Sequence, residues 1–182
     1  MKKAKWIIDP IHSELGFKIK HLMITNVPGS FKKFEGEVET EGEDFNTAAI
    51  RLKADMDSIS TNNEQRDAHL RSAEFFDVEQ YPDLNFKSTR IEKEDAEHFI
   101  LHGNLTIKGI THPVRLNLEY NGISQDPWGG ERAGFSVRGQ IRRTDFGMHF
   151  NSVLDTGGIG LSEEVKINAE MQLVKQQAEV LV

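Results

Sequence analysis

The chain lacks cysteine and long apolar segments. Because none of its 182 residues is cysteine, disulfides, thiolate metal sites and cysteine nucleophiles are excluded. No run of apolar residues is longer than three, whereas a membrane-spanning helix needs about 20. The formal net charge of −7 disfavours nucleic acid as a partner. We therefore expect one globular domain over residues 1–182 that neither spans a membrane nor binds nucleic acid.

Recognisable enzyme and metal motifs are also missing. The sequence has no G-x-S-x-G elbow, no H-E-x-x-H zinc motif and no phosphate-binding loop, and the kinase-like "DFG" at 145–147 follows no Gly-rich loop. His12 and His21 fall on opposite faces of one predicted strand, and His98 and His102 have no evident third ligand. The sequence predicts no catalytic site, no metal site and no cofactor.

What the sequence does have is strict alternation of apolar and polar residues, which is typical of strands with one buried face. At one point Lys108-Gly109 has the composition of a two-residue turn, which would place Leu101 opposite Leu116 and Phe99 opposite Leu118. Eight such amphipathic strands predict an all-β fold, either a closed antiparallel barrel or a two-sheet sandwich. The predicted strands are residues 14–21, 34–41, 50–58, 84–88, 98–107, 110–120, 135–143 and 165–173.

One short helix interrupts the strands. Thr61 and Glu64 have the spacing of a capping box, which predicts a polar helix over residues 63–73 that begins after Thr61. Phe75 and Phe76 follow it and can dock against the barrel.

Small residues occupy the middle of five predicted inward faces. Two interpretations remain open: the small side chains widen the barrel and leave an apolar cavity for a ligand, or they pack a tapered interior. These residues are Gly36, Ala54, Gly103, Gly139 and Ala169.

An arginine shares an inward face with apolar residues. Arg143 could bind the anionic or carbonyl head group of a ligand, or it could form a structural ion pair with Asp145 or Glu164. The sequence favours neither.

Several segments resemble the hallmark blocks of the YceI-like family. They include "WIIDPIHSELGFKIKH", "RDAHLRSAEFFDVEQYP", "GNLTIKGITHPVRL" and "RAGFSVRGQIRRTDFGM", and the resemblance runs from Trp6 to about Leu173. It implies a lipocalin-like, extended eight-stranded antiparallel β-barrel with one short helix. It also implies a long internal pocket for a polyisoprenoid chain, such as a polyprenyl pyrophosphate or ubiquinone.

The resemblance and the strand parity together suggest ligand-binding residues. Arg66 has a second interpretation, in which it joins Asp67 and His69 in holding the helix against the barrel. The candidate polar contacts are His21, Arg66 and Arg143, and the candidate wall residues are Phe17, Phe34, Met56, Phe86, Leu101, Phe135, Ile141, Phe146 and Val165.

The main functional hypothesis is a non-enzymatic carrier or store for a long isoprenoid-type lipid or quinone. One alternative is an enzyme that acts on such a lipid through His21 or Arg143; another is a filled barrel that binds a partner, such as a second copy in a homodimer. Many relatives carry a signal peptide, but "MKKAK" is followed here by no apolar stretch. We therefore expect a cytoplasmic protein, or a periplasmic one if a native leader has been removed.

Overall fold

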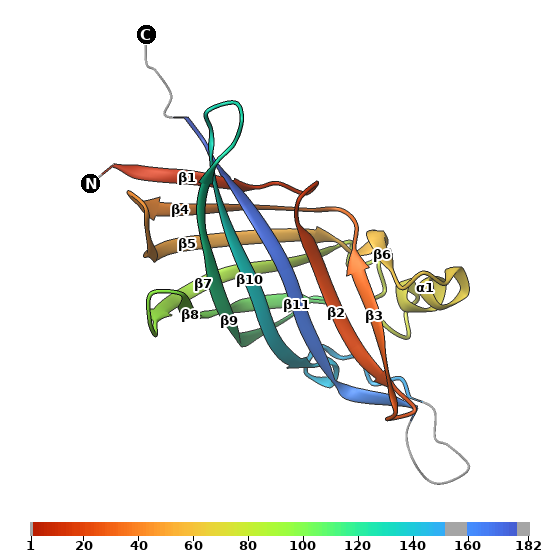
Figure 1. Ribbon diagram of the computed structural model, residues 1–182. Helices are drawn as coiled ribbons and strands as arrows, with labels where there is room; N and C mark the ends of the chain where they lie inside the picture. Colours follow the sequence, from red (N-terminus) through yellow and green to blue (C-terminus); the bar gives the residue numbers. More distant parts are fainter. Residues whose placement is uncertain (1, 152–159, 178–182) are drawn as a thin grey trace.

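The structure is a computed structural model that describes residues 2–151 and 160–177. Strands make up most of it, with one α-helix and two 3-10 turns (Figure 1). The elements are β1 (Lys3–Ile8), β2 (Glu14–His21), β3 (Thr25–Phe31), β4 (Phe34–Glu41), β5 (Asp44–Asp55), η1 (Met56–Ser58), β6 (Ile59–Ser60), α1 (Glu64–Arg71), β7 (Asp83–Lys93), β8 (His98–Ile107), β9 (Ile110–Gln125), β10 (Glu131–Arg142), η2 (Arg143–Phe146) and β11 (Leu161–Lys175).

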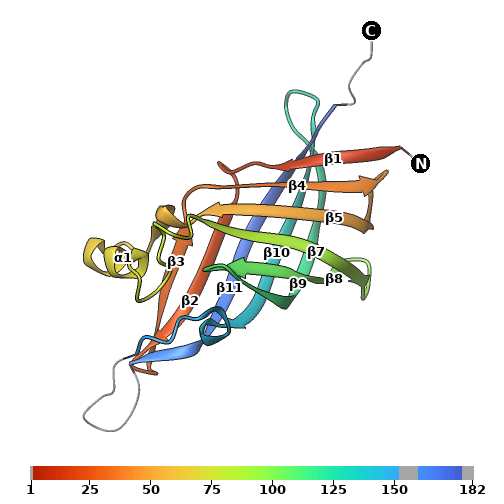
Figure 2. The same ribbon diagram turned by 180° about the vertical axis from the view of Figure 1, so that it is seen from behind.

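Eight of the strands form a closed antiparallel barrel, which confirms the predicted fold. Their order is β1-β4-β5-β7-β8-β9-β10-β11, and pairing between β1 and β11 closes the ring. β11 is long enough to have two partners on one edge: residues 173–175 pair with β1, and residues 161–170 pair with β2. β2, β3 and β6 thereby extend the wall beyond the ring, and α1 lies at that extended end (Figures 1 and 2).

The predicted hairpin has the predicted register. Lys108 and Gly109 connect β8 to β9 with φ angles of 54° and 74°, the combination that a type I′ turn requires. Leu101 lies opposite Leu116, and Phe99 lies opposite Leu118. Apolar side chains therefore meet on the buried face at these pairs, whereas Leu105 lies opposite His112.

Three strands were absent from the sequence-based prediction. β1 alternates in burial, with Trp6 and Ile8 inside, but it is short and its first half is rich in lysine. β3 contains Pro28 and Gly29, which are rare within strands. It tolerates Pro28 because β6 pairs only with Ser30 and the following residue, so the other edge of β3 is unpaired at Pro28. The closed ring therefore includes β1, whereas the predicted strand β2 lies outside it.

The helix begins two residues later than the capping box predicts. Asn63 is the N-cap, and its side chain accepts a hydrogen bond from the backbone N–H of Arg66. Thr61, the predicted cap, instead contacts Arg66 and Asp67 through its side chain. The aromatic anchor is confirmed, because Phe75 is buried directly after the helix.

Candidate ligand-binding site

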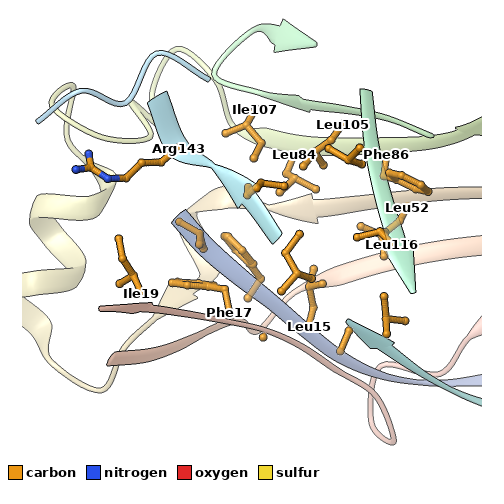
Figure 3. A pocket seen from close by; sticks show the side chains of 18 of the residues that line it. Leu15, Phe17, Ile19, Leu52, Leu84, Phe86, Leu105, Ile107, Leu116 and Arg143 are labelled. Atoms are coloured by element: carbon orange, nitrogen blue, oxygen red, sulfur yellow. The ribbon is translucent and has the colours of Figure 1, made fainter. Parts of the chain in front are cut away.

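A cavity of about 580 Å³ lies inside the barrel. Figure 3 shows aliphatic and aromatic side chains from β2, β5, β7, β8 and β9 that point into one common space, with Arg143 at one end. Among the described residues that line it, the polar side chains are His21, Thr61, Arg66, His69 and Arg143. All five lie at the α1 end of the barrel, so the rest of the wall is hydrocarbon.

The opposite end of the cavity is closed by aromatic rings. Phe45 packs between Trp6 and Phe135, with ring-centre distances of 5.2 and 5.0 Å, and Tyr120 lies 5.1 Å from Phe135. Trp6 is fully buried, and its indole N–H donates to Thr40 Oγ1 at 3.2 Å. We call Trp6, Phe45, Tyr120 and Phe135 the aromatic floor. The α1 end, where the polar side chains lie, is therefore the candidate entrance of the cavity.

Arg143 is the most buried charged residue of the site, with 3% of its surface exposed. Its Nε donates to the carbonyl of Ser162 at 2.9 Å, and its Nη1 donates to the carbonyls of Met148 and Phe150 at 2.9 and 2.7 Å. Burial lowers the pKa of Arg143 from its usual value. Its Nη2 donates no hydrogen bond to any described residue.

The predicted ion pair of Arg143 with Asp145 or Glu164 is not formed. Backbone carbonyls hold the guanidinium instead, and within residues 2–151 and 160–177 no carboxylate forms an ion pair with it. The reason is that β10 ends at Arg142, so Arg143 enters the η2 turn and points toward the carbonyls that follow it. Burying a cation without a direct ion pair costs several kcal/mol, and within the described residues the backbone carbonyls and the charge of Glu163 offset part of that cost.

Arg66 and Asp67 fix the start of the helix to Thr61, which follows β6. Asp67 is buried and accepts hydrogen bonds from the backbone N–H and the hydroxyl of Thr61 at 2.9 and 2.5 Å. Arg66 donates to the hydroxyl and the carbonyl of Thr61, both at 2.7 Å. His69 contacts Glu74 at 2.9 Å, and its ring packs edge-on against Phe150. Arg66 and Asp67 thus stabilise the start of the helix, and Arg66 also lines the cavity.

A model of the YceI-like domain matches residues 6–173, nearly the whole chain. The chain belongs to the YceI-like family. A UPF0312 protein of Staphylococcus epidermidis is 40% identical over 170 residues, which cover 93% of this chain and 96% of that protein. A UPF0312 protein of Staphylococcus aureus is 39% identical over the same shares of both chains.

Solved structures have the same barrel as this YceI-like protein. The YCEI protein of Campylobacter jejuni superposes with a TM-score of 0.76 at 31% identity, covering 88% of this chain and 91% of its own. A polyisoprenoid-binding domain from Saccharophagus degradans superposes with a TM-score of 0.67, covering 92% of this chain and 97% of its own. At 14% identity the second comparison shows the shared fold alone.

Most of the predicted site residues of this YceI-like protein lie on the cavity wall, whereas Phe34, Met56 and Phe146 do not. β5 ends at Asp55, whose side chain accepts a hydrogen bond from the backbone N–H of Asp57 and caps the η1 turn. Met56 therefore lies in this turn, where the alternation of inward and outward side chains along β5 no longer applies. Met56 and Phe146 are 1% exposed within the packed core, and Phe34 packs against that core at the start of β4. The predicted residues that line the cavity are Phe17, His21, Arg66, Phe86, Leu101, Phe135, Ile141, Arg143 and Val165.

Wall residues outside the regular strands were missed. Met148 and Phe150 follow η2, and Leu70, Phe75 and Phe76 come from α1 and the turn after it. Strand parity does not extend to such segments. The one usable signal was the aromatic pair after the predicted helix.

The apolar cavity that one interpretation predicted is present, but four of the five small residues do not line it. A Cβ atom on Gly103 would lie 2.4 Å from Phe86 Cζ, and one on Gly139 would lie 2.5 Å from Leu116 Cδ2. A side chain from the neighbouring strand thus covers each of these glycines, and Ile8 covers Gly36 in the same way. Of the five small residues, only Ala169 lines the cavity.

The histidines are separate, as predicted. The ring of His12 contacts Asp9 at 2.7 Å and that of His98 contacts Asp95 at 2.8 Å, both at the surface. Within the part of the chain that the structure describes, no three His, Asp or Glu side chains converge to hold a metal ion. In the same residues, α1 is the one α-helix, and its eight residues are too few to cross a membrane.

Proposed function

We propose that this protein binds one long isoprenoid-type lipid inside its barrel and carries or stores it without chemical change. The observation that supports this most strongly is the polarity of the cavity, which has a hydrocarbon wall, an aromatic floor and polar groups at the entrance only. Its volume of about 580 Å³ lies within the range of small-molecule sites. The ligand class is also that of the Saccharophagus degradans domain with the same fold.

The wall supplies the affinity for the lipid tail. Burial contributes about 0.8 kcal/mol per carbon, so three isoprene units contribute about 12 kcal/mol before the association cost of roughly 4–15 kcal/mol. The gain from the tail therefore falls within the range of the association cost, so contacts with the head group also contribute to whether the lipid stays bound.

Arg143 favours an anionic head group. A pyrophosphate would accept hydrogen bonds from Nη2 and form a direct ion pair with the guanidinium, which no carboxylate of the described residues does. A quinone carbonyl would accept the same hydrogen bond and leave the charge without a direct ion pair. We therefore place a polyprenyl pyrophosphate before a ubiquinone-like lipid as the ligand.

Native mass spectrometry of protein purified from its own host tests the proposal. Any bound molecule is then extracted into organic solvent and identified. One isoprenoid per chain is the expected result. A protein that is empty, and that also fails to take up added polyprenyl pyrophosphate, would contradict the proposal.

A further inference from the structure

The turn between β2 and β3 has an unusual composition for its conformation. Leu22 and Met23 have φ angles of 53° and 60°, and the N–H of Ile24 donates to the carbonyl of His21 at 3.2 Å. Two positive φ angles define a type I′ turn, in which Asn-Gly is strongly preferred and large side chains are strained. The same chain uses a glycine in its other such turn, at Gly109. This turn therefore keeps large apolar residues at a conformational cost.

Packing within the barrel does not offset the conformational cost of this turn. Leu22, Met23 and Ile24 are 40%, 49% and 78% exposed. The other large apolar side chains exposed in the described residues lie singly, whereas these three are consecutive. Isolated exposed apolar residues are normal, but a contiguous group indicates a contact surface. We call Leu22–Ile24 the apolar tip.

The apolar tip lies at the entrance of the cavity. Leu22 and His21 line the cavity, whereas Met23 and Ile24 do not. Figures 1 and 2 show that β2 and β3 project past the closed ring at the α1 end, so the tip is the outermost part of these strands. Whatever surface the tip contacts is therefore brought next to the cavity entrance.

Unpaired cations lie directly behind the apolar tip. Lys18 and Lys20 are exposed on β2, and Lys166 on β11 lies directly opposite Lys18. No ion pair joins any of the three to a carboxylate of the described residues. Lys20 and Lys18 are two and four residues from Leu22, about 7 and 13 Å along the strand. We call these three lysines the basic band, and it stands out in a chain of net charge −7.

An apolar edge backed by cations is the arrangement of proteins that bind anionic lipid surfaces. We infer that the apolar tip inserts into an anionic lipid bilayer, with the basic band among the head groups, so that the cavity entrance faces the membrane. A lipid could then move between bilayer and barrel without crossing water. This inference rests on the proposed function. A second copy of the chain fits the surface less well, because it would bring two basic bands together.

Vesicle flotation tests the inference. The vesicles are phosphatidylcholine with and without phosphatidylglycerol, and the variant is Met23→Gly/Ile24→Thr, which leaves Leu22 in the cavity wall. The glycine relieves the positive φ at residue 23, so the thermal midpoint should not fall. We expect the parent to float with the anionic vesicles, and the variant to bind them roughly a hundredfold more weakly, because two partly exposed apolar side chains no longer insert.

Trp128→Ser is the matched control. Trp128 is 83% exposed in the turn between β9 and β10, at the other end of the barrel, so its loss should leave flotation unchanged. Equal flotation of the parent and the tip variant would overturn the inference. So would a parent that does not float, a loss of binding in the control alone, or a parent dimer that the tip variant dissociates.

Binding of geranylgeranyl pyrophosphate without vesicles separates this inference from the proposed function. The tip variant should bind it as the parent does, yet take up lipid from vesicles more slowly. If the parent fails to bind it, the proposed function fails, while flotation still reports on the tip. If both proteins bind it and take up vesicle lipid at the same rate, the role of the tip in loading is overturned.

Discussion

Replacing Ala169 by phenylalanine should shorten the lipid that the barrel can hold. Ala169 is 2% exposed on β11, lines the cavity, and lies between Val137 of β10 and Leu15 of β2. A phenyl ring at this position occupies the space of about one isoprene unit. Losing five buried carbons at about 0.8 kcal/mol each costs about 4 kcal/mol, or roughly a thousandfold in affinity.

Calorimetric titration with prenyl pyrophosphates of increasing length measures this effect. The longest chain should lose most affinity, and the shortest should bind nearly as it does to the parent. Glu164→Phe, at an exposed position of the same strand, adds the same ring outside the cavity. It should change neither the affinity for the longest chain nor that for the shortest. If folded Ala169→Phe protein bound the longest chain as tightly as the parent, the lipid would not occupy this cavity.

Three further predictions concern polar groups. Arg143→Met should weaken prenyl pyrophosphate binding about 10- to 100-fold in the same titration, because a charge-assisted hydrogen bond is lost; equal weakening for the uncharged prenyl alcohol would contradict a head-group role. Asp67→Asn should lower the free energy of unfolding in urea by about 1–3 kcal/mol, since Thr61 loses a charged hydrogen-bond acceptor. An unchanged urea midpoint would contradict a stabilising role for the contact between Asp67 and Thr61. Burial raises the pKa of Asp9, but hydrogen bonds from His12, Arg132 and a backbone N–H outweigh it and lower the value to about 2 from 3.8. Because the folded pKa is the lower one, this stabilisation of about 2 kcal/mol is present above pH 4 and is lost as pH falls toward 2; Asp9→Asn should remove that part of the pH dependence in acid unfolding.

The fold was predictable wherever apolar residues alternate along a regular strand. The hairpin around Lys108-Gly109 followed from turn chemistry and cross-strand pairing together, so its register was correct residue by residue. β3 was not predictable in the same way, because Pro28 and Gly29 argue against a strand unless its unpaired edge is known.

The site was predictable in its wall but not in its polar contacts. Parity identifies which side of a strand is buried, so Phe17, Leu101 and Val165 were placed on the wall. It does not show whether a neighbouring side chain fills the space next to a small residue, as Leu116 does at Gly139. Nor does it identify backbone carbonyls as the partners of Arg143, because that depends on where β10 ends.

Under the proposed function, the aromatic floor sets the length of the lipid that fits the barrel. A head group held by Arg143 and a tail stopped by Phe45 have a fixed separation. A shorter lipid leaves part of the wall uncovered, and a longer one must either fold or pull its head group away from the arginine. Trp6, anchored by Thr40 behind Phe45, keeps this stop rigid. The distance between floor and entrance, more than the chemistry of the wall, would then decide which member of a homologous lipid series the protein selects.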